Sequence, residues 1–284
     1  YLRSDSGKYD AFIFFGYLYA TTYFGLPLVK EKAWLAPLGH DEWPIYFTMW
    51  DSFFTIPRGF IFQTEQEREF LLRRFPTLSL VGPVAGVGID PPNRVHPEGF
   101  RAKYALDKPF LLYAGRIDAS KGCAALVEWF IARNGDTPPY KLVLIGREVL
   151  PVPYHPDIVY LGFVSEEDKW NGMAACDWLV IPSEFESLSI SLLETWGVGR
   201  PAIVNAKSEV LRGHCRGANG GVWYHDWADC ELFLRNIDEG SKRILGKQGH
   251  AYVQSRYSWN RIEASYEDAL QTCKKAKRSP VPDR

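Results

Sequence analysis

The chain has 284 residues, of which 46% are hydrophobic and 24% charged, a balance typical of a folded globular protein with a full core. Its 33 Lys and Arg against 34 Asp and Glu give a formal net charge of -1. We therefore expect no nucleic-acid partner, because such proteins normally carry a basic excess. The five cysteines contain no C-x-x-C pair, so reduced thiols are expected, without disulfides or a zinc site; they are Cys123, Cys176, Cys215, Cys230 and Cys273.

The first segment with a clear pattern is Ala11 to Val29, 19 residues without a charge. That is near the length of a membrane-spanning helix, but the segment contains two Gly, several hydroxyls and Pro27. We therefore expect a buried strand at 11–15 followed by a loop. No signal peptide is expected, since Tyr1 is followed by Leu, Arg and Ser. The absence of an initiator Met suggests a chain that starts within a longer protein.

Further strands are expected at 59–63 and 79–84. Between them, Thr64 and Glu67 form a T-x-x-E capping box, which predicts a helix from there to about Arg74. The polar, Pro-rich stretch Pro91 to Gly99 is typical of a linker between domains.

The second part of the chain alternates regularly between short apolar runs and amphipathic segments. Strands are expected at 110–114, 141–145, 158–161, 177–181, 201–204 and 221–224, with helices at about 121–133, from Ser165, and at 189–196. Such alternation predicts βαβ units and a parallel sheet buried on both faces. Helical patterns follow from Asp229 to about Lys277, with a basic tail at Lys274 to Arg278.

Three segments of this second part carry candidate binding residues. The first, Tyr113 to Gly122, is a strand end and a Gly-bearing loop with Arg116 and Lys121. Ligands of parallel sheets bind at the carboxyl ends of strands, and two cations beside helix amides suit a diphosphate. A tight turn with two solvated cations is the alternative.

The second segment, Pro182 to Glu194, also follows a strand, and it places Glu186 in a loop and Glu194 in the helix after it. A carboxylate can accept hydrogen bonds from two sugar hydroxyls. The alternative is a helix-terminal Glu that complements the dipole and an ordinary surface Glu. The third segment, Leu161 to Ser165, could present its backbone to a planar base, although a plain turn explains it as well.

Together these segments read Y-x-G-R-x-x-x-x-K-G, L-G-F-V-S-x-E-x and P-S-x-x-E-x7-E-x-x-x-x-G-x-P. In order and spacing they closely resemble retaining glycosyltransferases of glycosyltransferase family 4, over roughly residues 108–225. Upstream, Ala36 to Glu42, the helix opened by Thr64 and the G-V-G-I-D at Gly86 to Asp90 resemble the rear half of the family's acceptor domain.

The resemblance implies a role for each matching residue. Arg116 and Lys121, with Gly115 beside them, would bind the donor diphosphate, and Glu186 would contact the transferred sugar. Glu194 would hold the ribose hydroxyls, with Ser189, Ile190 and Ser191 at the start of its helix. Phe163 and Val164 would frame the base, largely through backbone atoms. His40 would face the donor sugar from the acceptor domain, although a structural histidine explains it equally well.

The resemblance implies an α/β protein of the GT-B fold, with two Rossmann-like domains facing a cleft. We expect part of the acceptor domain at 1–107, the donor domain at 108–262, and a C-terminal helix and tail at 263–284. The acceptor domain is expected to be incomplete, because about three strands precede the linker where about six are needed. The chain could be a truncation or a shortened natural form, or its front could be a separate fragment. Ser187 and Ser189 stand where the family commonly has Gly, so the resemblance does not determine the identity of the donor sugar.

The implied reaction transfers a hexosyl group from a nucleoside-diphosphate sugar to a hydroxyl with retention, as in polysaccharide or glycolipid synthesis. No nucleophilic carboxylate pair is evident, so a mechanism in which the nucleotide departs on the face that the acceptor attacks fits better. No D-x-D cluster is present, so neither a metal nor another cofactor is expected.

The acceptor would be a saccharide or a lipid-linked molecule, and the location of the protein would be cytoplasmic. The basic tail could touch anionic lipid at the inner membrane face, or be a solvated helix end. A nucleotide-sugar-binding subunit without its own activity, or an epimerase, are the alternatives.

Overall fold

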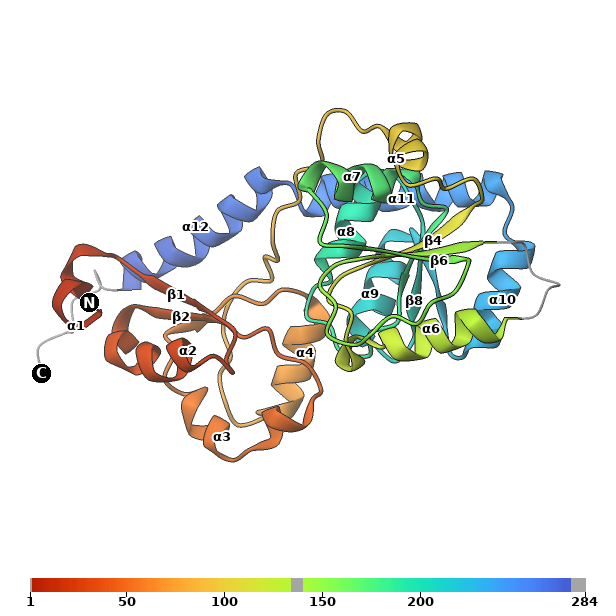
Figure 1. Cartoon of the computed structure of the whole chain (residues 1–284). Helices are drawn as coiled ribbons and strands as arrows, with labels where there is room; N and C mark the ends of the chain where they lie inside the picture. The colour runs from red at the N-terminus through yellow and green to blue at the C-terminus, as the bar shows by residue number, and fades with distance from the viewer. Residues whose placement is uncertain (1, 134–139, 277–284) are drawn as a thin grey trace, which may run out of the picture. The chain divides into compact units, whose positions relative to one another are not determined.

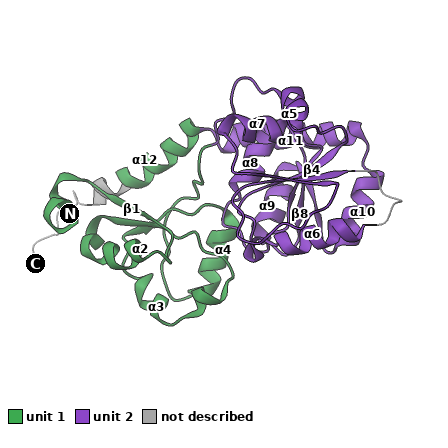
Figure 2. Cartoon of the chain, in the orientation of Figure 1, with its two compact units in different colours: residues 1–88, 259–284 green, residues 89–258 purple. Residues whose placement is uncertain are grey.

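The computed structural model describes the backbone of residues 2–133 and 140–276, with side chains as far as residue 271. The chain divides into two compact units (Figure 2): unit 1 comprises residues 1–88 and 259–284, and unit 2 residues 89–258. These divisions differ from the expected boundaries after residues 107 and 262. Residues 89–107 belong to unit 2, and the chain returns to unit 1 at Trp259.

Unit 1 is built on a parallel sheet of three strands in the order β1-β2-β3, with β1 at Phe12–Phe15, β2 at Ala33–Ala36 and β3 at Gly59–Phe60. The central strand β2 is buried along its length, yet sequence analysis missed it. Its apolar run of four residues lies between Lys32 and Pro37, too short for a clear period. The expected strand at 11–15 is present as β1, but it is half-buried because it lies at the sheet's edge.

Two other expectations for unit 1 are wrong. The loop expected after the first strand is helical, with α2 at Ala20–Gly25 and the 3-10 segment η2 at Leu26–Lys32. Pro27 occupies the first turn of η2, where its missing N–H is not needed. The expected strand at 79–84 is reduced to one isolated bridge, Phe62 with Val84. Pro83 has no N–H to continue a ladder.

The remaining elements of unit 1 are helical. They are α1 (Leu2–Asp5), η1 (Ser6–Lys8), η3 (Trp43–Tyr46), α3 (Met49–Phe53), α4 (Glu65–Arg74) and α12 (Trp259–Ala276). Helix α12 packs Tyr266, Ala269 and Leu270 against the buried Trp34 and Ala36 of β2. This apolar contact explains why the C-terminal helix belongs to unit 1.

The capping box at the start of α4 is confirmed, since Thr64 accepts a hydrogen bond from the backbone N–H of Glu67 at 3.1 Å. The Glu67 carboxyl group, however, accepts from the backbone N–H groups of Gly39 at 2.7 Å and Gln63 at 2.5 Å. Glu67 is only 1% exposed, and burial raises its pKa to about 8. This buried side chain therefore ties the loop after β2 to helix α4.

Unit 2 contains a parallel sheet of six strands in the order β6-β5-β4-β7-β8-β9. The strands are β4 (Phe110–Ala114), β5 (Lys141–Ile145), β6 (Ile158–Gly162), β7 (Trp178–Ile181), β8 (Ala202–Asn205) and β9 (Gly221–Tyr224). The first strand of the unit thus lies in the middle, and the chain proceeds outward from it first to one side and then to the other. This is the strand order 3-2-1-4-5-6 of the doubly wound nucleotide-binding fold. All six strands lie at the places expected from sequence.

Helices cover both faces of this sheet (Figure 1). They are α5 (Pro97–Lys103), α6 (Cys123–Ala132), α7 (Glu166–Ala175), α8 (Ile190–Gly197), α9 (Glu209–Ala218), α10 (Trp227–Asn236) and α11 (Glu239–Arg256), with a 3-10 turn η4 at Ala119–Lys121. Leu111 and Tyr113 of β4 point into a core shared with α6 and α10. Helices α7, α8 and α11 lie on the opposite face.

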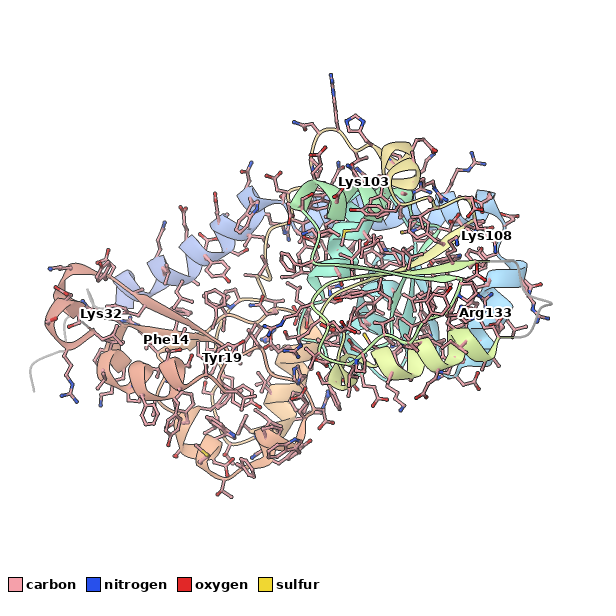
Figure 3. The ribbon with its side chains drawn as sticks, in the orientation of Figure 1. Phe14, Tyr19, Lys32, Lys103, Lys108 and Arg133 are labelled. Atoms are coloured by element: carbon pink, nitrogen blue, oxygen red, sulfur yellow. The ribbon has the colours of Figure 1, made fainter. Side chains whose placement is uncertain are left out.

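The segment expected to be a linker, 91–99, already forms the start of helix α5 at Pro97. Phe100 of α5 is 1% exposed and packs close to Gly172 of α7. Lys103, labelled in Figure 3, bonds the carboxylate of Asp168 at 2.6 Å and holds the pKa of that carboxyl below its usual range. Helix α5 is thus fixed to α7, which explains why the boundary lies earlier than expected.

Among the helices of residues 2–133 and 140–276, none has the length and apolar character needed to cross a membrane. The four described cysteines, Cys123, Cys176, Cys215 and Cys230, are free and buried. Cys273 and the basic tail at Lys274 to Arg278 lie outside the described side chains.

Candidate functional site

A cavity of about 760 Å³ opens in unit 2 where β4, β5, β6 and β7 end. Its lining comes from the carboxyl ends of these strands and from the first turns of α7 and α8. Strands β4 and β7 are the neighbours from which the chain runs in opposite directions across the sheet. In a doubly wound fold this crevice is where ligands bind.

The loop after β4 is held by its own side chains. The Tyr113 hydroxyl donates to the carbonyl oxygen of Arg116 at 2.7 Å, and Asp118 accepts from the backbone N–H of Lys121 at 3.1 Å. Arg116 also forms an ion pair with Asp118, and its side chain is 55% exposed. Gly122 closes the loop at φ 71°, where a Cβ atom would lie 2.7 Å from the carbonyl oxygen of Pro182. The loop therefore needs glycine at that position.

Two predicted site residues form an ion pair beside this loop. The Nζ atom of Lys121 lies 2.9 Å from Oε1 of Glu186, in the loop between β7 and α8. The two side chains are 33% and 14% exposed. Both line the cavity, so a charged ligand there would meet a cation and a carboxylate at hydrogen-bond distance from each other.

A second ion pair in the cavity involves Glu194 of α8 and Lys169 of α7, whose Nζ lies 2.7 Å from Oε1 of Glu194. Burial raises the pKa of Glu194, and the bond to Lys169 acts in the opposite direction. Burial lowers the pKa of Lys169, but its bonds to Glu166 and Glu194 outweigh burial and leave that pKa raised. Glu194 thus lies in a partly desolvated place and has a cationic partner.

The start of α8 has an unusual backbone. Ser189, its N-cap residue, has φ 66° and ψ 76°, a left-handed conformation that favours glycine. Its hydroxyl has no hydrogen-bond partner among the residues that the structure describes. The preceding carbonyl, that of Leu188, lies 2.9 Å from Nε2 of the buried His214 on α9. The loop that contains Glu186 is therefore anchored to the core.

The loop after β5 and the loop after β6 complete the cavity. Gly146 has φ 137°, and a Cβ atom there would lie 1.9 Å from the carbonyl oxygen of Gly115, so only glycine permits this close approach. Phe163, after β6, lines the cavity although its side chain is 91% exposed. An exposed ring at the edge of a cavity offers a flat apolar surface to a ligand.

The structure brings nearly all predicted site residues together. This one cavity is lined by Gly115, Arg116, Lys121, Phe163, Val164, Glu186, Ser189, Ile190, Ser191 and Glu194. The exception is His40, which lies in unit 1, with Nδ1 3.4 Å from Oε1 of Glu42. The role of each residue stays a prediction.

Sequence analysis missed two cations in the lining, Arg147 and Lys169. Arg147 follows Gly146 directly after β5, so it has the same strand-end context that drew attention to Arg116. Lys169 lies in the first turn and a half of a helix whose start at Ser165 was predicted. The usable signal for Arg147 was its position after a strand end, and that for Lys169 was the predicted start of its helix.

Among the described residues, no group of three or more His, Cys, Asp or Glu side chains is placed to hold a metal ion.

Comparisons with known proteins agree with this geometry. A family model described as "Glycosyl transferases group 1" matches residues 98–239. The chain is 30% identical over 119 residues to an α-D-kanosaminyltransferase of Streptomyces kanamyceticus (37% of this chain, 30% of that protein). It is 28% identical over 176 residues to the lipopolysaccharide core biosynthesis glycosyltransferase LpsE of Rhizobium meliloti (58% and 50%). The chain thus spans half or less of these two relatives.

Solved structures share the fold at low sequence identity. HepE of Anabaena, in complex with UDP and glucose, superposes with a TM-score of 0.78 at 13% identity, over 95% of this chain and 80% of that chain. Sucrose-phosphate synthase from Thermosynechococcus elongatus gives 0.71 at 18% identity, over 86% and 68%.

The six-stranded order and the crevice in its middle define unit 2 as a Rossmann-like unit, and the chain has the GT-B fold. Because the family model covers half of its length, the chain belongs to the glycosyl transferases group 1.

Proposed function

We propose that this protein transfers a hexosyl group from a nucleoside-diphosphate sugar to an acceptor hydroxyl with retention of the anomeric configuration, in polysaccharide or glycolipid synthesis. The observation that carries the proposal is the cavity at the β4/β7 crevice, where Arg116, Lys121, Glu186 and Glu194 all line one space. Cations for a diphosphate and carboxylates for sugar hydroxyls are the two sets of groups that such a donor needs.

The diphosphate would lie against the loop after β4 and the start of α8. Arg116 and Lys121 supply positive charge there, and the first backbone N–H groups of α8 have no partners within the helix. As the bond to the sugar breaks, negative charge grows on the departing phosphate. Cations held in place beforehand stabilise that charge without reorganising.

The carboxylates would hold the two sugars of the donor. Glu194 would accept hydrogen bonds from ribose hydroxyls, and Glu186 would contact the transferred sugar. The family resemblance supports both assignments, and the lining of the cavity is compatible with them. HepE was solved with UDP-glucose, which supports a nucleotide sugar as the donor here.

The reaction would proceed by departure of the nucleotide on the face that the acceptor attacks, with the leaving phosphate taking the acceptor's proton. The protein then supplies positioning and charge. Unit 2 would bind the donor, and unit 1, with His40, the acceptor. We propose that no metal is required; loss of transfer in EDTA and its return with magnesium would contradict this.

The first test is calorimetric titration with UDP, ADP, GDP and their glucose derivatives. We expect one nucleotide to bind to the wild type and to bind at least tenfold more weakly to Glu194→Ala, since a hydrogen bond to a charged group contributes about 1.5–3 kcal/mol. Glu128→Ala is the matched control, because Glu128 is exposed on α6 and does not line the cavity. Equal affinities in all three proteins would contradict the donor site.

The second test separates a transferase from a nucleotide-sugar-binding subunit. A chain with its own activity slowly hydrolyses the bound donor, releasing sugar and nucleoside diphosphate, whereas a binding subunit leaves the donor intact. Retention is read from the anomer of the product by NMR.

A further inference from the structure

Lys169 occupies a central place in the part of the cavity formed by α7 and α8. Its ammonium nitrogen lies 2.7 Å from Oε1 of Glu194 and 2.7 Å from Oε1 of Glu166. Glu166 is largely solvated, with 70% of its side chain exposed, whereas Lys169 and Glu194 are 24% and 13% exposed. All three line the cavity. The pair that matters to a ligand is therefore the sheltered one, Lys169 with Glu194.

The ion pair between Lys169 and Glu194 leaves one hydrogen-bond donor and one acceptor available to a ligand. An ammonium group has three donors, of which Glu166 and Glu194 take two. Glu194 is bonded only through Oε1, and its Oε2 has no hydrogen bond among the described residues. One donor and one carboxylate oxygen are thus left beside each other. Together they fit two neighbouring hydroxyls, one donating to Oε2 and the other accepting from Nζ.

We propose that Lys169 determines recognition of the nucleoside: it keeps Glu194 ionised and, together with that carboxylate, binds the two vicinal hydroxyls of a ribose. The proposal rests on the proposed function, and it adds a residue that the motif of the family does not contain. It predicts that a ribonucleotide binds better than its 2′-deoxy form, because the deoxy form leaves one polar group of the pair without a partner.

The charges around Glu194 support this role. Lys169 lowers the pKa of Glu194, whereas burial and Glu166 raise it. On α11, which packs against α8, His250 bonds the carbonyl oxygen of Gly197. Lys121 is paired with Glu186. Removal of the Lys169 charge therefore leaves Glu194 in a partly buried place without a cation, and its pKa should rise further.

The experiment measures binding of UDP and 2′-deoxy-UDP by calorimetry from pH 5 to pH 9, or of the corresponding ADP or GDP pair if that base is selected in the first titration. The proteins are the wild type, Lys169→Gln, Lys169→Arg and Glu167→Gln. Glu167→Gln is the matched control, because Glu167 is exposed on the same helix and does not line the cavity. Melting temperatures establish that each variant is folded, and Lys169→Met replaces Lys169→Gln if the latter is not.

We expect Lys169→Gln to bind UDP about tenfold or more weakly, as for a lost charge-assisted hydrogen bond, and to lose most of the preference for UDP over 2′-deoxy-UDP. The pH below which affinity falls should also move upward, because an ionised Glu194 is needed. Lys169→Arg should recover most of the affinity, and Glu167→Gln should stay within about twofold of the wild type.

The inference is overturned if Lys169→Gln keeps the wild-type ratio of the two affinities and the wild-type pH midpoint, whatever happens to affinity itself. A wild type that binds no nucleotide would instead overturn the proposed function, and this inference with it. The pKa of Glu194, read by carboxyl NMR in the ligand-free proteins, gives an independent check: an unchanged pKa in Lys169→Gln overturns the proposal as well.

Discussion

Lys121 and Glu186 are 65 positions apart in the sequence, yet their Nζ and Oε1 atoms lie 2.9 Å apart in the structure. The contact forms because β4 and β7 are neighbours in the sheet, so the loops that follow them emerge side by side. A diphosphate bound to Lys121 would compete with Glu186 for its ammonium group. We therefore expect donor binding to release the Glu186 carboxylate toward the sugar.

The first prediction concerns the cation of this pair. Lys121→Ala should lower the rate of sugar transfer by a factor of about 10²–10³, since removal of one donor to a developing oxyanion typically costs about 2.7–4 kcal/mol in the barrier. The fold should be little affected, because partly exposed ion pairs contribute about 0–1 kcal/mol to stability. Steady-state kinetics and thermal melts measure the two effects. A loss of rate below tenfold would speak against a role in the departure of the phosphate.

The second prediction concerns the ring of Phe163. Since its side chain is 91% exposed, Phe163→Ala should change the free energy of unfolding by less than about 0.5 kcal/mol. If the ring stacks on the nucleotide base, the same variant should bind the nucleotide about 1–3 kcal/mol more weakly, the range for stacking of a base on an aromatic side chain. Calorimetry with Phe163→Leu as a non-aromatic control measures this. Unchanged binding in Phe163→Ala would mean that only the backbone meets the base.

The third prediction concerns the strained backbone of Ser189. Ser189→Gly should raise the free energy of unfolding by about 1 kcal/mol, because a left-handed conformation costs a residue with a Cβ atom about 1–2 kcal/mol. Ser191→Gly is the matched control: Ser191 lies inside α8, where glycine destabilises by about 0.5–1 kcal/mol. Urea denaturation should thus give shifts of opposite sign for the two variants. A destabilised Ser189→Gly would show that the serine side chain stabilises this turn.

The fourth prediction concerns acid stability. Burial lowers the pKa of His214 to about 4, from an ordinary value of 6.5. The folded state therefore prefers the neutral ring, and the stability that this provides is present above pH 6.5 and lost as the pH falls through about 4. The shift corresponds to roughly 3 kcal/mol. Denaturation of wild type and His214→Gln between pH 7 and pH 4 should show a steeper loss in the wild type. Parallel curves would contradict the prediction.

The site could be found from sequence because its residues stand at fixed places after predictable strands. Short apolar runs such as those of β4 and β7 are buried on both faces of a parallel sheet, so the pattern identifies them directly. The residues after each run then lie at one edge. This is why Arg116, Glu186 and Glu194 could be placed in one site before any distance was known.

Unit 1 was much less predictable. Its central strand β2 is four residues long, and its helices α2 and α3 are six and five residues long. Segments of this length complete too few turns or alternations for a period to be recognised. Their conformation is fixed instead by packing around an aromatic core that includes Trp50, Phe54 and Phe60.

The sequence alone thus determined the strands of unit 2, the edge at which its cavity lies, and the residues of the family motif, because all of these follow from local period and spacing. Only the tertiary structure decided the pairing of Lys169 with Glu194 and the left-handed turn at Ser189. It also decided that α5 belongs to unit 2 and α12 to unit 1. These features depend on which surfaces bury one another. Residues far apart in the chain meet there, and no local pattern encodes such a meeting.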